Sequence, residues 1–188
     1  SNAFNIDFSI LKPEEYSFPL PVGKAEVKGG QALEITTTKG DAVKAMFNGR
    51  VRLSRRTSQY GNTIVVRHDN GLETVYAYNA QNLVQVGTRV KAGQTIAIAG
   101  GDNGRVYCLF AIMVNGGWIN PETVINPKSH KLRKQVLQCK KTGKNVSVTV
   151  LNKEKDENTS LDPDISNDDY ENGSSLKIDL KKIEQQHW

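Results

Sequence analysis

The 188-residue sequence contains no apolar run that approaches the roughly 18 residues needed for a membrane helix, so we expect no membrane span. It also lacks a helix-turn-helix, zinc-finger or aromatic RNA-binding signature, and we therefore expect no nucleic-acid partner. Histidine is scarce, because the whole chain holds only three, at His68, His130 and His187. Few imidazoles are therefore available to any metal centre.

Cysteine is equally scarce, and the two residues leave a single possible disulfide, between Cys108 and Cys139. Cys108 lies between Tyr107 and Leu109 in a predicted strand. Because side chains alternate between the two faces of a strand, Cys108 should point into the core as a buried free thiol. The disulfide stays open as an alternative, since it would suit an oxidising compartment.

Charge is unevenly distributed along the chain. Residues 152–188 hold ten acidic and five basic side chains, so the preceding part carries +10 against a net charge of +5 for the whole. A basic body of this kind could attract an anionic polymer such as peptidoglycan over a long range. The alternative is that its arginines are simply the solvated faces of strands. The arginines concerned are Arg50, Arg52, Arg55, Arg56 and Arg67.

Short β-branched or alternating runs predict an almost entirely β fold. These runs are Ala32–Thr36, Ala42–Met46, Gly49–Leu53, Thr63–Arg67, Glu73–Ala77, Thr95–Ala99 and Val106–Met113. Asn-Gly pairs at 48–49, 70–71 and 115–116 are strong hairpin signals, and they predict a meander of antiparallel strands. The prolines of Phe18–Pro21 predict an extended segment that leads into this region.

The length is sufficient for one well-buried domain with an appendage. We expect an N-terminal segment at residues 1–17 that starts with a tag scar, a main domain at 18–127 and a C-terminal extension at 128–188. In the extension, Lys134–Cys139 and Asn145–Leu151 flank Thr142–Lys144 and predict a hairpin. The acidic residues 152–175 predict a long loop or disorder, and alternation at Leu176–Leu180 predicts a final strand that pairs with the hairpin.

Several short motifs between residues 18 and 125 occur together in a characteristic order. They are Tyr60-Gly61-Asn62, Val65 to Gly71, Thr74 to Tyr78, Val86 to Gln94, Asn115-Gly116 and Asn120-Pro121. In this order and spacing they resemble the lysostaphin-type (LytM-like) peptidoglycan zinc metallopeptidases. The resemblance implies an all-β, antiparallel sheet domain related to duplicated-hybrid and barrel-sandwich folds, here with a C-terminal β extension. It also implies an exported bacterial protein of the periplasm or cell envelope.

Other residues occupy all five positions at which this family carries its zinc ligands and catalytic histidines. When this chain is aligned with the family's His-x-Gly-Ile-Asp-Ile segment, Gly30 replaces the His and Glu34 replaces the Asp. In the family's His-Leu-His-Phe-Glu segment, Tyr107 replaces the first histidine and Leu109 replaces the second. Tyr78 replaces the family's histidine after Tyr-Ala. Only Glu34 retains a donor atom in a ligand position, and one carboxylate cannot hold a catalytic zinc. We therefore expect no metal, no cofactor and no catalytic residue.

Three classes of function follow. The first is a non-catalytic relative whose groove, at Glu34, Tyr78 and Tyr107, binds peptidoglycan or a partner such as a cell-wall amidase, since some family members without ligands are activators of amidases. In that class the two phenol rings either contact a ligand or only fill the space left by the metal. The second is a cell-wall metalloendopeptidase with a non-standard site. The third is a carrier module, because Val90–Gln94 also resembles biotinyl and lipoyl domains, although Ala45–Phe47 has no lysine after its methionine.

Overall fold

The computed structural model describes residues 3–152, which form two antiparallel sheets and three short 3-10 turns. The strands are β1 (Ala3–Asp7), β2 (Lys24–Lys28), β3 (Ala32–Thr36), β4 (Ala42–Lys44), β5 (Gly49–Thr57), β6 (Gly61–Arg67), β7 (Leu72–Asn82), β8 (Arg89–Val90), β9 (Thr95–Ala99), β10 (Tyr107–Val114), β11 (Gly117–Ile119), β12 (Val136–Thr142) and β13 (Asn145–Asn152). The 3-10 turns are η1 (Pro13–Glu15), η2 (Asp69–Gly71) and η3 (Pro121–Thr123). The predicted all-β fold is confirmed, and no helix of the described part is long and apolar enough to span a membrane.

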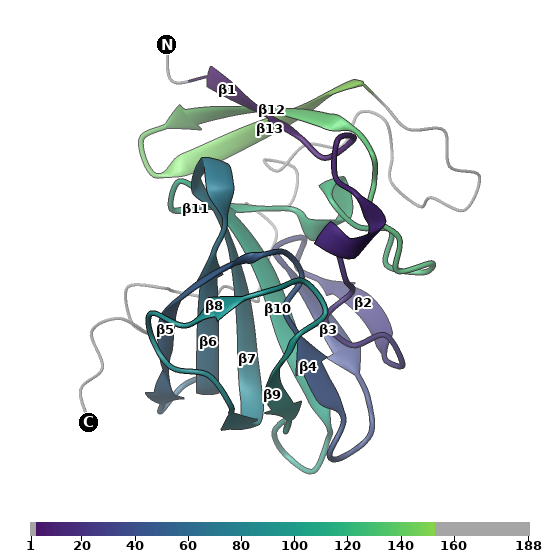
Figure 1. Cartoon of the computed structure of the whole chain (residues 1–188), viewed down its shortest axis with the longest axis vertical. Helices are drawn as coiled ribbons and strands as arrows, with labels where there is room; N and C mark the ends of the chain where they lie inside the picture. Colours follow the sequence, from purple (N-terminus) through teal and green to yellow (C-terminus); the bar gives the residue numbers. More distant parts are fainter. Residues whose placement is uncertain (1–2, 153–188) are drawn as a thin grey trace.

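The larger sheet has the strand order β2-β3-β10-β7-β6-β5-β8, with β11 paired to β10 and β9 paired to both β4 and β7 (Figure 1). Strands that follow each other in the chain pair in β2–β3, in β5–β6–β7 and in β10–β11, so the predicted meander holds only over these segments. Elsewhere it is wrong, because β10 inserts between β3 and β7 and pairs with both. Such an insertion depends on contacts between distant segments, which local turn signals do not encode.

The three Asn-Gly signals have different outcomes. Asn115-Gly116 joins β10 to β11 in a tight two-residue turn, with φ of 48° and 81°. Residues 70–71 belong to η2, which links the paired strands β6 and β7. The prediction of a hairpin at Asn48-Gly49 is wrong, because β4 pairs with β9 and not with β5. Gly49 is needed there for close packing, since a Cβ at this position would meet the His68 ring at 2.7 Å and also the backbone of Arg67.

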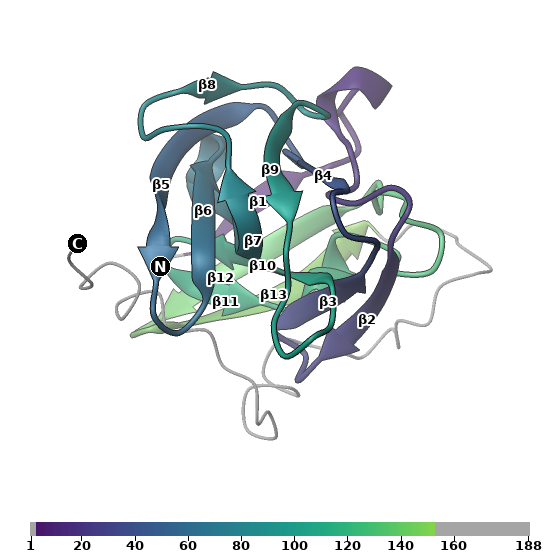
Figure 2. The same ribbon diagram turned by 90° about the horizontal axis from the view of Figure 1, so that it is seen from below.

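The smaller sheet has the order β1-β12-β13 and lies across one end of the larger sheet (Figures 1 and 2). The predicted C-terminal hairpin is confirmed as β12 and β13. The pairing of β1 with β12 was not predicted, and it joins the two ends of the described chain. Gly117 in β11 packs directly against Val146 in β13, which ties the two sheets together. The predicted strand Leu176–Leu180 lies outside the described residues, and the three domain boundaries remain a prediction.

Strand β10 separates two hydrophobic clusters by simple alternation. Cys108, Phe110, Ile112 and Val114 point into the main core, and the alternate residues of β10 point to the opposite face of the sheet. As predicted, Cys108 is fully buried. Both cysteines are free thiols, so the disulfide alternative is wrong. Burial raises the pKa of Cys108 to about 12.

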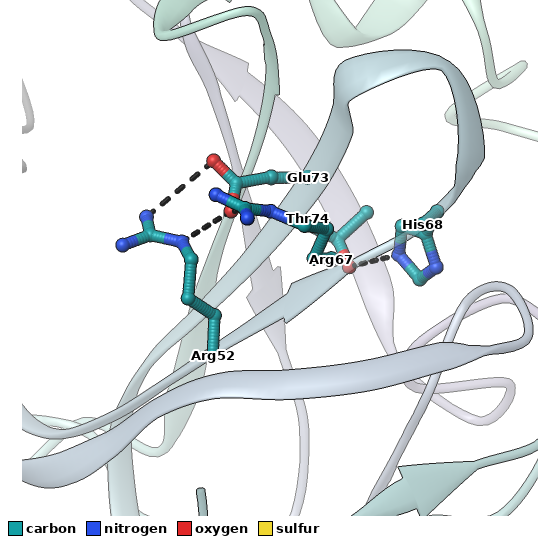
Figure 3. A network of polar contacts seen from close by, with 5 residues as sticks. All are labelled: Arg52, Arg67, His68, Glu73 and Thr74. Carbon is teal, nitrogen blue, oxygen red and sulfur yellow. Dashed lines mark hydrogen bonds and ion pairs between the residues drawn. The ribbon is translucent and has the colours of Figure 1, made fainter. Parts of the chain in front are cut away.

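A buried chain of hydrogen bonds runs from His68, on the core side of the larger sheet. The His68 Nδ1–H donates to the Asn48 carbonyl at 2.7 Å. Nε2 therefore accepts from the Thr74 hydroxyl at 2.8 Å (Figure 3). Thr74 Oγ1 in turn accepts from the Tyr76 hydroxyl at 2.7 Å, and the Tyr76 oxygen accepts from the Met46 N–H at 2.9 Å. In this series each donated hydrogen has one acceptor, and a protonated Nε2 could not accept from Thr74, so the series requires a neutral imidazole. Desolvation by burial accordingly lowers the pKa of His68 to about 4, against a smaller opposing effect of its bond to Asn48.

Candidate functional site

The predicted site positions come together on the face of the larger sheet that points away from the main core. Strand register aligns Leu109 of β10 with Glu34 of β3 on one side and with Ala77 of β7 on the other. Tyr107 lies two residues before Leu109 on the same face of β10, and Tyr78 follows Ala77. The pairing of three strands from distant parts of the chain therefore places these residues side by side on one face of the sheet.

A cluster of buried apolar residues, here called the floor cluster, lies on the same face of the sheet. Its members are Ala32, Leu53, Tyr60, Val65, Val75, Ala77, Leu109, Ala111 and Met113. The predicted groove is the surface around Glu34, Tyr78 and Tyr107 beside this cluster. Tyr78, Tyr107 and Trp118 pack against the cluster and are only partly buried. Leu109 is 2% exposed, so at this position, where the family has a histidine, an apolar side chain is buried in the floor cluster. Trp118 was not anticipated from the sequence, because only the β10–β11 hairpin brings it over Met113.

Tyr78 is held in a left-handed backbone conformation, with φ of 61°. This region is unfavourable for a bulky side chain and persists only where the surroundings impose it. Here the Tyr78 N–H donates to the Tyr60 carbonyl at 2.8 Å, and its own carbonyl accepts from the Gly101 N–H at 2.7 Å. Its hydroxyl donates to the Gln59 carbonyl at 3.1 Å. Loops on both sides therefore fix the direction of the Tyr78 ring.

The two tyrosines that replace histidines contact each other. The Tyr78 and Tyr107 ring centroids lie 5.3 Å apart with an interplanar angle of 49°, and the Tyr60 ring lies 6.3 Å from Tyr78 in an edge-on arrangement. Desolvation raises the pKa of Tyr78 and, with the nearby Tyr78 phenol as a further cause, raises the pKa of Tyr107 to about 12. Both phenols are therefore neutral hydrogen-bonding groups at physiological pH, and they form an aromatic surface at this end of the groove.

Arg105 is the site residue that sequence reasoning missed. Its guanidinium forms an ion pair with Glu34, and its central carbon lies 5.1 Å from the centroid of the Tyr107 ring. The Glu34 side chain is 13% exposed and that of Arg105 is 58% exposed. The one carboxylate among the family's ligand positions is thus already bound by a cation. Arg105 lies two residues before Tyr107, in the loop between β9 and β10, and this closeness in sequence is the signal that could have indicated it.

The turn before β3 contains the remaining family position, Gly30. Its φ of 70° follows a φ of 62° at Gly29, so the two glycines make the tight turn from β2 to β3. Gly30 therefore has a backbone role here. Without a side chain it contributes no donor atom to the groove.

The histidines do not gather at this site. His68 faces the core, as described above, and His130 stacks on Phe18 with centroids 3.9 Å apart. His187 lies outside the described residues. Over residues 3–152, no group of three or more His, Cys, Asp or Glu side chains could hold a metal ion.

An open cavity of about 400 Å³ lies beside Tyr78. Its lining includes Tyr78, Asn62, Gly101 and Asp102. A ligand that contacts the Tyr78 ring therefore has space to extend into this cavity.

Comparison with known proteins gives a family and a fold. A model described as Peptidase family M23 matches residues 28–121. The murein hydrolase activator EnvC of Escherichia coli (strain K12) is 39% identical over 94 residues, which cover 49% of this chain and 22% of the relative. The peptidoglycan DD-endopeptidase ShyC of Vibrio cholerae serotype O1 is 34% identical over 110 residues, which cover 57% of this chain and 25% of the relative. The match therefore spans about a quarter of the length of these curated relatives.

The solved structure of the antimicrobial peptidase lysostaphin from Staphylococcus simulans is similar in fold. It aligns with a TM-score of 0.54 at 23% sequence identity, over 60% of this chain and 53% of that chain. This confirms the lysostaphin-like antiparallel architecture that the sequence motifs predict.

Proposed function

The chain belongs to Peptidase family M23, and from this premise we propose that it is a non-catalytic member that binds peptidoglycan or a cell-wall hydrolase, such as an amidase, through the groove at Glu34, Tyr78 and Tyr107. The protein acts in the bacterial periplasm or cell envelope. It needs no metal or other cofactor for this binding, and it has no nucleic-acid partner.

The contact of Arg105 with both Glu34 and Tyr107 carries the proposal. A zinc peptidase must leave its ligands free for the metal and keep one coordination position open for water. In this groove the carboxylate is paired with a guanidinium, and the neighbouring positions hold neutral phenols and a buried leucine. These groups suit recognition, because tyrosine offers a rigid apolar ring with a polar tip and is enriched at binding interfaces.

Two relatives support different outcomes. EnvC, by its name, is an activator of murein hydrolases, and it shares 39% identity with this chain over 94 residues. This supports a role in which the domain binds without cleaving. ShyC, by its name, is an endopeptidase, and it favours the alternative of a cell-wall metalloendopeptidase with a non-standard site.

A binding experiment with a groove variant tests the proposal. The double change Tyr78→Ala and Tyr107→Ala removes both rings and should weaken binding to purified sacculi or to a cell-wall amidase by about 1–3 kcal/mol, the range for losing buried aromatic anchors. The matched control is Leu83→Ala with Val86→Ala, since these apolar side chains are exposed and lie outside the floor cluster. Binding is measured by sedimentation with sacculi and by calorimetry with the amidase.

The result separates the alternatives if muropeptide release is followed in the same preparations. The non-catalytic proposal requires binding that depends on the two tyrosines and no release with or without zinc. Release that stops when a chelator is added would instead establish the endopeptidase. A folded groove variant that binds as well as the control would show that the groove is not the binding site.

A further inference from the structure

Three arginines stand side by side across neighbouring strands of the larger sheet. Arg50 of β5 is directly opposite Arg89 of β8 in one direction and directly opposite Arg67 of β6 in the other. Residues directly opposite each other in antiparallel strands point to the same face. We call Arg89, Arg50 and Arg67 the arginine row.

This arrangement is unfavourable for the protein alone. Neighbouring strands are about 4.8 Å apart, and like charges directly opposite each other destabilise a sheet. The row therefore concentrates three positive charges within about 10 Å, two strand spacings. A negatively charged partner would reduce the repulsion between these three side chains.

Glu73 neutralises only the inner end of the row. This carboxylate, 8% exposed, forms ion pairs with Arg52 and with Arg67, the latter at 3.4 Å (Figure 3). Between residues 3 and 152, no acidic side chain forms an ion pair with Arg50 or Arg89. Arg50 and Arg89 thus present their guanidinium groups to solvent.

The row also lines a cavity of about 680 Å³. Lys91 adds a fourth cation to its wall, Asn48 and Gln94 add polar groups, and Asp69 contributes the one carboxylate among its described lining residues. The wall therefore carries four positive side chains and one negative side chain. Its amide and guanidinium donors are spread over a space that a small polyanion can enter.

We propose that the arginine row, with Lys91, is a binding site for an extended ligand that carries two or more oxyanions, either phosphates or carboxylates. Guanidinium groups bind both kinds of oxyanion in a two-pronged geometry, and partial desolvation in a cavity strengthens such contacts. One anion placed between Arg50 and Arg89 and a second near Lys91 would offset the repulsion along the row.

This site is separate from the tyrosine groove. Arg67 aligns with Glu73 of β7, and Tyr78 lies five residues further along that strand. At about 3.3 Å per residue the two sites are about 16 Å apart. The proposal stands on the strand register and does not depend on what the groove binds.

The test is a titration of the full chain with tripolyphosphate and, separately, with an unstructured poly-glutamate peptide. The row variant is Arg50→Gln with Arg89→Gln. The control is Lys24→Gln with Lys39→Gln, which removes the same charge from two exposed residues that do not line the cavity. Calorimetry at about 20 and 200 mM salt gives the affinities and their salt dependence.

We expect the row variant to bind at least about tenfold more weakly than the native chain, and the control to stay within about twofold. Stronger binding of tripolyphosphate identifies a phosphate-bearing ligand, and stronger binding of poly-glutamate identifies a carboxylate-bearing one. Equal losses in the two variants would show attraction by net charge alone and would overturn the site. Absence of binding to either probe at low salt would also overturn it. Thermal unfolding checks the fold, since the row variant should be at least as stable as the native chain once the repulsion is relieved.

Discussion

Acid should destabilise this protein through His68 by an amount that the structure predicts. The imidazole is buried, accepts a hydrogen bond from Thr74, and has a pKa lowered from 6.5 to about 4, first through desolvation. In the unfolded chain the same group titrates near 6.5. Between these two values the unfolded state binds more protons than the folded state, so stability falls as pH falls.

The magnitude follows from the size of the shift. The stabilising contribution is fully present above pH 6.5 and is lost as the pH falls toward 4. One pKa unit corresponds to 1.36 kcal/mol, so a shift from 6.5 to about 4 predicts a loss of about 2 kcal/mol at pH 5 and about 3 kcal/mol at pH 4. Protonation would also force Thr74 to accept a hydrogen bond from the ring, which reverses the chain of donors through Tyr76.

Urea denaturation at several pH values between 7 and 4 measures this effect, and a His68→Gln variant isolates it from the carboxylates. The variant should be less stable than the native chain at pH 7, because its amide cannot reproduce both ring contacts. Its disadvantage should shrink by about 3 kcal/mol on going to pH 4, since the variant has no imidazole to protonate. A stability difference that stays constant across this range would refute a neutral, buried His68 in the folded state.

Two further outcomes concern the groove. After zinc loading and gel filtration, elemental analysis should find far less than one zinc per chain. The reason is that Glu34 is the only residue with a donor atom in the family's ligand positions, and Arg105 already binds it. One tightly held equivalent of zinc would contradict the non-catalytic proposal. Arg105→Gln should lower the free energy of unfolding only slightly, as for other exposed ion pairs, and should loosen the Tyr107 ring. Chemical denaturation and the near-ultraviolet circular dichroism of the tyrosines measure these two effects, and an unchanged spectrum would show that Arg105 does not order Tyr107.

Local pattern was sufficient for much of the fold and for the identity of the site positions. Ala32–Thr36 and Thr95–Ala99 are strands with the predicted bounds, because β-branched alternation acts over a few residues. Asn115-Gly116 makes the predicted turn, since positive φ is a property of the residue pair itself. The motif order indicated the family, and it placed Tyr78 and Tyr107 where histidines were expected.

Tertiary structure alone decided which distant segments meet. The insertion of β10 between β3 and β7 brings Tyr107 against Tyr78, and a tight turn directs Arg105 to Glu34. The pairing of β5 with both β6 and β8 turns three arginines that are far apart in sequence into one row. The sequence by itself determined the faces along which side chains alternate, because that period is a property of each strand. The register between strands depends on burial and pairing over the whole chain, so only the folded structure decided which charges and rings became neighbours.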